Sequence, residues 1–273
     1  MVEQGKAIEI ESVLKENRSF PPSEAFVKQA NLGPEEYRQM LEKAEADTTG
    51  FWEDRARELD WFSGWEKALE WNPPFAKWFV GGKINASYNC LDRHLKSGKG
   101  DKTAIIWEGE PGEVRKLSYR EVYEEVCRLS NALKKIGVEK GDRIAMYMPL
   151  VPELAISMLA AARIGATHTV IFGGFSAEAI RDRVNDCGCK VIITADGGYR
   201  RGTEINLKKT VDEALEDAPS IEHVIVLKRT GSTVEIKPSR DYWWHEIIGR
   251  EKAEFEPESL DSEHPLFVLY TSG

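Results

Sequence analysis

Two glycine-containing segments of the sequence carry residue types that bind anions. The first opens with Phe172, Gly173 and Gly174 and ends at Ser176, which can cap the helix expected after it. Paired glycines let backbone N–H groups approach a ligand closely, and a helix N-terminus attracts negative charge. Taken alone, the segment is more typical of a tight turn between a strand and a helix that binds nothing.

The second segment places two adjacent arginines in a glycine-rich turn. Arg200 and Arg201 stand directly before Gly202, with Lys208 and Lys209 further along. A guanidinium group is a planar fork that binds phosphate oxygens through two hydrogen bonds. A solvated basic turn is the alternative explanation for these residues alone. Because both segments follow predicted strands, we expect them at one edge of a sheet, which favours an anionic, nucleotide-like ligand.

A third candidate stands at the end of the printed sequence. Thr271, Ser272 and Gly273 follow an apolar run, and hydroxyl groups with free amides after a strand are typical of the start of a phosphate loop. We therefore expect the sequence to be cut at or before a phosphate-binding site.

The residue pattern gives little support for a metal site or for a catalytic nucleophile. The five histidines are scattered and the four cysteines form neither a disulfide framework nor a zinc pattern, so we expect no metal site. No nucleophile elbow is present, and we assign no catalytic residue within these 273 residues. Free thiols, together with the lack of a signal peptide or an apolar span, predict a cytoplasmic protein.

Composition narrows the choice of partners. Hydrophobic residues make up 41% and charged residues 30%, as in a folded domain, and the net charge is −9. An acidic protein lacks the basic surface that nucleic acids and anionic membranes require, so we expect neither as a partner. A local basic pocket for an anionic small molecule is compatible with this charge.

The candidate segments need a scaffold of alternating strands and helices. Short apolar runs predict strands at residues 103–107, 143–148, 167–172, 190–195, 223–227 and 266–270. Helical periodicity occupies most of the intervals between them. This pattern predicts βαβ units in an α/β fold, with a largely parallel sheet covered by helices on both faces.

Four helices are indicated between these strands. The first starts at a capping box of Ser118 and Glu121, continues as an apolar stripe to Ile136, and ends at Gly137. The second, at residues 152–164, is apolar on most sides and should be buried. The stripes of the other two are Ile180, Val184 and Cys187, and Leu207, Val211, Ala214 and Leu215.

The first hundred residues differ from the rest. They hold five of the eight tryptophans, among charged residues and turn signals. We expect short helices and loops whose aromatic side chains are buried against another part of the protein. Residues 1–100 would then be a helical and loop segment that packs on an α/β subdomain at residues 101–273.

Several short segments together are typical of one protein family: Trp78-Phe79 and residues 85–95, 100–102, 147–149, 152–153, 170–176 and 241–245. On these segments the chain resembles, from about Phe51 to its last residue, the acetyl-CoA synthetases, the short-chain branch of the adenylate-forming acyl-CoA synthetases. Residues 270–273 are similar to the start of the family's phosphate loop, which continues Ser-Thr-Gly-x-Pro-Lys-Gly. The resemblance identifies the chain as the N-terminal part of a larger enzyme.

The resemblance implies a two-step ligase reaction. Acetate attacks the α-phosphate of Mg-ATP to give an acetyl-adenylate and diphosphate, and the CoA thiol then displaces AMP. Propionate or another short carboxylic acid is an alternative substrate, and a non-catalytic nucleotide- or CoA-binding module is an alternative of a different class. We expect the chain on its own to be inactive and to retain at most weak affinity for CoA.

The resemblance also implies roles for particular residues. Those matching the family's CoA-nucleotide contacts are Phe172, Gly173, Gly174, Arg200 and Gly202. A second family arginine falls at Thr203, and Arg201 is the candidate to replace it. Thr271, Ser272 and Gly273 match the start of the ATP phosphate loop. The acyl pocket, the adenine contacts, the metal-binding carboxylate and the catalytic lysine belong to family segments outside this sequence.

Overall fold

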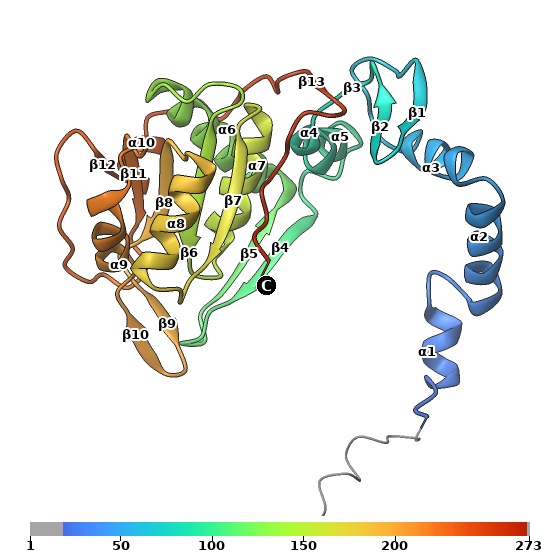
Figure 1. Cartoon of the computed structure of the whole chain (residues 1–273). Coiled ribbons are helices and arrows are strands. Elements are labelled where there is room, and N and C mark those ends of the chain that lie inside the picture. The colour runs from blue at the N-terminus through green and yellow to red at the C-terminus, as the bar shows by residue number, and fades with distance from the viewer. Residues whose placement is uncertain (1–18, 272–273) are drawn as a thin grey trace, which may run out of the picture. The chain divides into compact units, whose positions relative to one another are not determined.

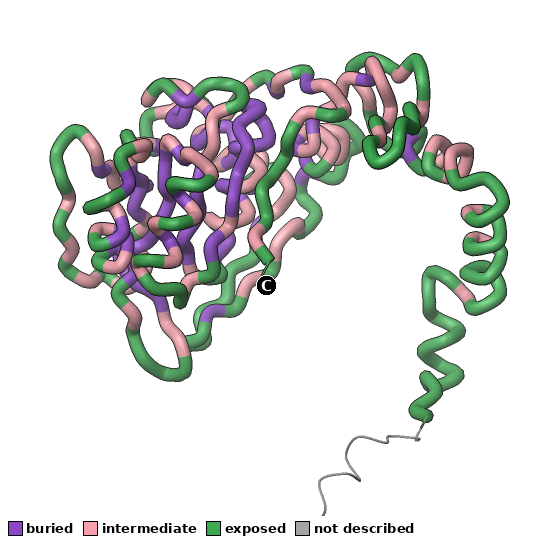
Figure 2. Tube along the Cα trace, in the orientation of Figure 1, coloured by how far each residue is buried: buried purple, intermediate pink, exposed green. Residues whose placement is uncertain are grey.

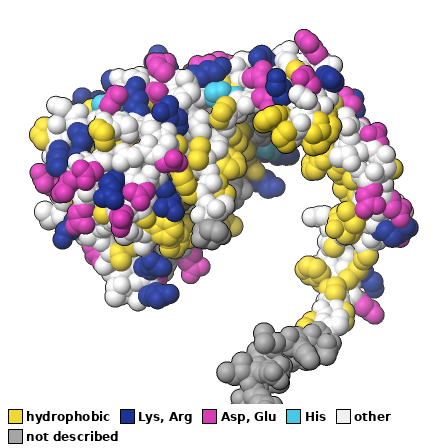
Figure 3. Space-filling view, in the orientation of Figure 1, with side chains coloured by type: hydrophobic (Ala, Val, Ile, Leu, Met, Phe, Trp, Pro, Cys, Tyr) yellow, Lys and Arg dark blue, Asp and Glu magenta, His cyan; other side chains and the backbone are white. Residues whose placement is uncertain are grey.

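The computed structural model describes residues 19–271, and the chain divides into two compact units, Met1–Arg55 and Ala56–Gly273. The first contains the helices α1 (Glu24–Gln29), α2 (Pro34–Ala46) and most of α3 (Thr48–Ala56). No residue of α1 or α2 is buried. Figure 3 shows apolar side chains on the surface of these helices. Phe26, for example, is 68% exposed. These helices therefore contribute no core of their own.

The second unit is built on a five-stranded sheet in the order β12-β11-β8-β6-β7 (Figure 1). Its strands are β6 (Arg143–Met148), β7 (Thr167–Phe172), β8 (Val191–Ala195), β11 (His223–Leu227) and β12 (Asp241–Trp243). All neighbouring strands are parallel. The predicted α/β class and four of the six predicted strands are thus confirmed in this sheet, with all its carboxyl ends at one edge.

Helices cover both faces of the sheet. One face carries α6 (Tyr119–Lys135), α7 (Pro152–Arg163) and α10 (Trp244–Ile248), and the other carries α8 (Ala177–Cys187), α9 (Leu207–Ala214) and the 3-10 turn η2 (Leu215–Asp217). Strand β6 supplies both cores, since Ile144 and Met146 face one side and Ala145 and Tyr147 the other. Figure 2 shows the buried residues concentrated in these strands.

Capping residues determine where α6 begins and ends. Ser118 Oγ accepts a hydrogen bond from the Glu121 amide at 3.2 Å, and Glu121 Oε2 accepts one from the Ser118 amide at 2.7 Å. This is the predicted capping box, and α6 ends one residue before its cap, Ile136. Gly137 follows with φ +87°, a conformation that glycine adopts without strain. The predicted burial of α7 is confirmed for seven of its residues.

Two predicted strands behave differently from the expectation. Residues 103–107 do form β4 (Thr103–Glu108), but it pairs antiparallel with β5 (Val114–Ser118) in a separate hairpin. Residues 266–270 form no strand, because they meet β7 at a single bridge between His168 and Phe267. Beyond that bridge the Tyr270 hydroxyl bonds to α8 instead of the chain continuing the ladder.

Residues 56–100 contain strands that the sequence interpretation did not anticipate. A hairpin of β1 (Lys67–Asn72) and β2 (Phe75–Val80) is followed by β3 (Lys83–Ile84), α4 (Ala86–Cys90) and α5 (Asp92–Lys96), and β3 pairs with β13 (Leu260–Asp261). The expectation of helices and loops alone is therefore wrong. Pro73 and Pro74 form the two-residue turn between β1 and β2, so a turn signal of the sequence here joins two paired strands.

Burial of the early tryptophans is only partly as expected. Trp61 and Trp65 pack edge-on against each other and against Phe79. Trp52 and Trp71 are 50% and 65% exposed among the described residues, so their burial against another part of the protein stays a prediction. The role of residues 1–100 as a segment that packs on the α/β part in the whole protein stays a prediction.

Among the described residues, no helix is long and apolar enough to cross a membrane. All four cysteines are free.

Candidate functional site

A cleft of about 670 Å³ lies where the sheet's strands end at their carboxyl termini. Its walls come from the segments after β4, β6, β7 and β11 and from a hairpin after β8. Residues that line it include Trp107, Leu150, Phe172, Tyr199, Arg200 and Arg229. Open α/β sheets bind ligands at this edge because the loops after parallel strands converge there.

The glycine segment after β7 forms one wall of the cleft. A side chain on Gly173 would place its Cβ 2.8 Å from the carbonyl oxygen of Met148, so only glycine fits there. Ser176 caps α8 as predicted, since its Oγ accepts a hydrogen bond from the Ala179 amide at 3.3 Å. From β6, the Tyr147 hydroxyl donates to the Phe175 carbonyl at 2.9 Å. Burial raises the pKa of Tyr147, which keeps this hydroxyl a donor.

The segment after β8 is a hairpin and not the loop that we expected. It consists of β9 (Gly198–Arg200) and β10 (Thr203–Ile205), paired antiparallel. Arg201 and Gly202 form its two-residue turn, with φ of +53° and +76°. Two successive positive φ values are typical of the turn that suits the twist of a short hairpin. Arg201 is therefore exposed at the tip, whereas Arg200 ends the strand that faces the cleft.

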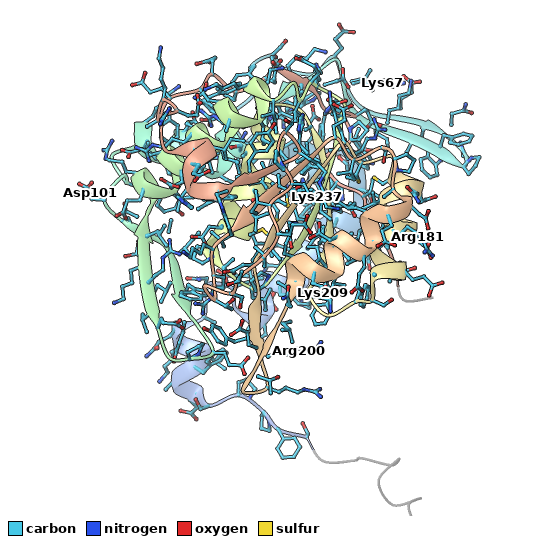
Figure 4. All side chains as sticks on the ribbon, turned by 90° about the vertical axis from the view of Figure 1, so that its left-hand side faces the viewer. Lys67, Asp101, Arg181, Arg200, Lys209 and Lys237 are labelled. Carbon is cyan, nitrogen blue, oxygen red and sulfur yellow. The ribbon has the colours of Figure 1, made fainter. Side chains whose placement is uncertain are left out.

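Arg200 brings the two predicted segments together. Its guanidinium carbon lies 5.2 Å from the centre of the Phe172 ring. A side chain on Gly174 would collide with the same guanidinium. The three residues therefore form one surface at the carboxyl edge of the sheet, and Figure 4 shows Arg200 on the hairpin in the lower half of the view. The expected proximity of the two segments is confirmed.

Several residues around the cleft were missed by the sequence interpretation. The Arg229 guanidinium lies 5.2 Å from the Trp107 ring and 4.9 Å from the Tyr199 ring, and it pairs with the Glu113 carboxylate at 2.9 Å. The Glu110 carboxylate accepts a hydrogen bond from the Gly202 amide at the hairpin tip. These contacts join the β4–β5 hairpin to the β9–β10 hairpin, although no sequence pattern links the two.

Asp196 holds the loops after β8 and β11 together through hydrogen bonds, and the sequence interpretation also missed this role. Its carboxylate is fully buried and accepts hydrogen bonds from the amides of Gly197, Arg229 and Thr230 at 2.7, 2.7 and 3.0 Å, and from that of Gly231 at 2.7 Å. An aspartate directly after a strand and before two glycines is the available signal, because its side chain commonly accepts nearby backbone amides.

The lysines expected to add positive charge do not do so. Lys208 is fully buried, and its Nζ lies 2.6 Å from Asp212 Oδ2 and 2.9 Å from Asp241 Oδ2. Lys209 is exposed but does not line the cleft. The cations on the cleft wall are Arg200 and Arg229, and Arg229 is already paired.

The third candidate is described only in part. Thr271 is exposed, while Ser272 and Gly273 lie outside the described residues. The preceding Tyr270 is held by α8, where its hydroxyl donates to Asp186 Oδ2 at 2.6 Å. Within residues 19–271, no group of three His, Cys, Asp or Glu side chains could hold a metal ion.

Comparison with known proteins assigns a class to this fold and cleft. The family model for AMP-binding enzymes matches residues 91–273, and the model for the acetyl-coenzyme A synthetase N-terminus matches residues 37–90. The chain belongs to the AMP-binding enzyme family.

Individual relatives show which members of the family the chain is similar to. The chain is 52% identical to an acetyl-coenzyme A synthetase of Streptomyces coelicolor, over 96% of this chain and 40% of the relative. It is 54% identical to that of Rubrobacter xylanophilus, over 94% of this chain and 39% of the relative. The structure of acetoacetyl-CoA synthetase from Streptomyces lividans matches with a TM-score of 0.77 at 26% identity, over 84% of this chain and 35% of that chain. The chain thus spans about two fifths of the length of these curated relatives.

Proposed function

We propose that the full-length protein is an AMP-forming acetate–CoA ligase. An acetate oxygen attacks the α-phosphorus of ATP, and diphosphate leaves; the CoA sulfur then attacks the acetyl carbon, and AMP leaves. The products are acetyl-CoA, AMP and diphosphate. About 50% identity to acetyl-coenzyme A synthetases along nearly the whole chain supports this proposal.

Within this reaction, the described cleft would hold the nucleotide end of CoA. Arg200 offers a charged hydrogen-bonding fork for a phosphate, and Phe172 offers a ring that is 54% exposed. Gly173 and Gly174 let the Met148 carbonyl and the Arg200 guanidinium pack closely against this segment, and Gly202 and Arg201 form the adjoining hairpin tip. Arg201 is proposed as the second cation, in place of the family arginine that is Thr203 here.

The ATP site would begin at the C-terminal end of the printed sequence. Thr271, Ser272 and Gly273 are proposed to start the loop around the ATP phosphates. Magnesium would arrive with ATP and neutralise phosphate charge, and we assign it no ligand from residues 19–271. A cytoplasmic location stays a prediction from the cysteine pattern.

The single observation that carries the CoA assignment is the contact of Arg200 with Phe172 and Gly174. Phe172 ends β7 and Gly174 follows it, whereas Arg200 ends β9 in the hairpin after β8. Their meeting creates a cationic, ring-lined rim on the cleft. Both chemical steps depend mainly on positioning and on neutralising charge, which such a rim supplies for the coenzyme.

The function is tested with the full-length protein and a panel of short acids. ATP–diphosphate exchange and CoA thioester formation are measured with acetate, propionate and butyrate. We expect the highest kcat/KM with acetate. A preference for propionate would support the related ligase, and CoA binding without diphosphate exchange for any acid would contradict a ligase and favour a non-catalytic module.

A further inference from the structure

Arg183 on α8 lies between two aromatic rings from segments that the proposed function assigns to different substrates. Its guanidinium carbon is 4.8 Å from the centre of the Phe175 ring and 5.3 Å from that of Tyr270. Phe175 belongs to the glycine segment assigned to CoA, and Tyr270 directly precedes the residues assigned to ATP. A cation over an aromatic face is attracted to it, so Arg183 attracts both rings at once.

The Arg183 side chain is fixed by its own helix. Its Nη1 donates to the Ala179 carbonyl at 2.9 Å, one turn earlier in α8, and the residue is half-buried. A guanidinium held in this way cannot follow one ring without leaving the other. The geometry therefore ties the position of Phe175 to that of Tyr270.

Tyr270 is attached to the same helix by its hydroxyl. The hydroxyl lies 2.6 Å from Asp186 Oδ2 and 3.3 Å from the Arg183 carbonyl oxygen. Burial and the Asp186 carboxylate raise the pKa of Tyr270, so the hydroxyl stays a donor at neutral pH. One turn of α8 thus holds the residue from which the proposed phosphate loop departs.

On the other side, the contacts continue to the cleft. The Phe175 and Phe172 rings meet edge-on with centroids 5.9 Å apart, and Phe172 in turn lies against Arg200. An unbroken series of ring and guanidinium contacts therefore runs from the cleft through Arg183 to Tyr270.

We propose that Arg183 is a positioning residue that holds the CoA segment and the entrance of the ATP phosphate loop in register. It touches neither substrate and acts through Phe175 and Tyr270. The inference rests on the proposed function, because the two segments serve different substrates only in a ligase of this kind.

The test compares Arg183→Leu with Arg181→Leu in the full-length enzyme. Arg181 lies on the same helix with a side chain 34% exposed, but it pairs with Glu178 and Asp182 and contacts neither ring. The KM for ATP is measured by diphosphate exchange without CoA, and the KM for CoA by thioester formation. We expect R183L to raise both KM values roughly threefold to tenfold, with a smaller change in kcat, and R181L to change neither.

Two further variants keep the test decisive if R183L folds poorly. Arg183→Lys retains the charge, so its KM values for ATP and for CoA should lie between those of R183L and those of the wild-type enzyme. Tyr270→Phe retains the ring and removes the hydroxyl, so it should raise the KM for ATP while leaving that for CoA near the wild-type value.

The outcomes separate this inference from the proposed function. Suppose that the wild-type enzyme is active but R183L changes only one of the two KM values, or R181L changes both KM values as much as R183L does. Either result would leave the proposed function standing and overturn the positioning role of Arg183. A fall in active fraction with both KM values unchanged would also overturn it, since that is a purely structural effect. A wild-type enzyme without diphosphate exchange would overturn the proposed function and this inference together.

Discussion

Asp241 and Lys208 illustrate how a buried charge is tolerated at the level of single residues. Both side chains are fully buried, and Arg240 adds a second cation, donating to Asp212 at 2.7 Å and to Asp241 at 2.5 Å. Burial raises the pKa of Asp241, but hydrogen bonds from Arg240 and Lys208 outweigh it, so the pKa lies below its ordinary value of 3.8. Two cations and two carboxylates therefore satisfy one another within the protein.

Asp241→Asn should destabilise the chain in a pH-dependent way. At pH 7 we expect the free energy of unfolding to fall by about 3 kcal/mol, because the buried Lys208 and the half-buried Arg240 lose a charged partner. A lowered native pKa stabilises the fold fully above the unfolded value of 3.8 and loses this effect as pH falls through the lower native value. Urea unfolding from pH 7 to pH 3 should therefore show the two proteins converging at the acidic end.

Asp101→Asn is the matched control, since that side chain is 99% exposed. It should leave the free energy of unfolding within about 0.5 kcal/mol of wild type. A pH-independent loss in Asp241→Asn would contradict the ionic explanation.

Arg200→Ala addresses the proposed CoA contact. In the full-length enzyme, losing a charged hydrogen bond of about 1.5–3 kcal/mol should raise the KM for CoA by about tenfold to a hundredfold. Diphosphate exchange, which needs no CoA, should barely change. Arg201→Ala gives the comparison, with a smaller effect expected from the exposed hairpin tip. Equal losses in both half-reactions would count against the assignment.

At the scale of elements, helix ends and strand ends decide where the cleft residues lie. Capping at Ser118 and Ser176 starts α6 and α8 at defined residues. The β9–β10 hairpin then projects Arg200 back toward the glycine segment after β7. The cleft is thus assembled by connections and not by the sheet alone.

Ser118→Ala tests how much the N-terminal cap of α6 contributes to the free energy of unfolding. Losing the side-chain cap should cost about 1 kcal/mol of unfolding free energy, because the Glu121 amide is left without its acceptor. Ser118→Thr keeps a hydroxyl that accepts from the Glu121 amide and donates to the Glu121 carboxylate, so it should retain most of the stability. Thermal unfolding followed by circular dichroism checks both, and equal losses in the two variants would rule out the capping explanation.

At the scale of the whole molecule, the sheet and both of its cores lie within the second unit, Ala56–Gly273. The first unit has no buried residue in α1 or α2, which are 6 and 13 residues long. Isolated helices of this length are marginal in water.

We therefore expect residues 56–273 to unfold in one cooperative transition when expressed alone. Circular dichroism and tryptophan fluorescence should give coincident curves. A peptide of residues 19–55 should show little helix under the same conditions. Separate transitions for the two probes would contradict a single cooperative unit at residues 56–273.

Much of the scaffold was accessible from local pattern. Four strands of the parallel sheet, four helices and the cap at Ser118 agree with the prediction, because apolar periodicity and capping depend on neighbouring residues. The hairpin β1–β2 was missed because charged residues and tryptophans in residues 67–80 hide a half-exposed strand pattern. Residues 266–270 have the composition of a strand but meet β7 at only one residue pair.

The sequence by itself determined the α/β class, the glycine and arginine segments of the cleft, and a family resemblance that the comparisons confirm. Only the tertiary structure decided that Arg200 lies on Phe172, that Lys208 is buried among carboxylates, and that Asp196 and Arg183 tie separate loops together. The reason is physical: caps and periodicity act within a few residues, whereas these contacts join side chains that are brought together only by the path of the chain through the folded protein.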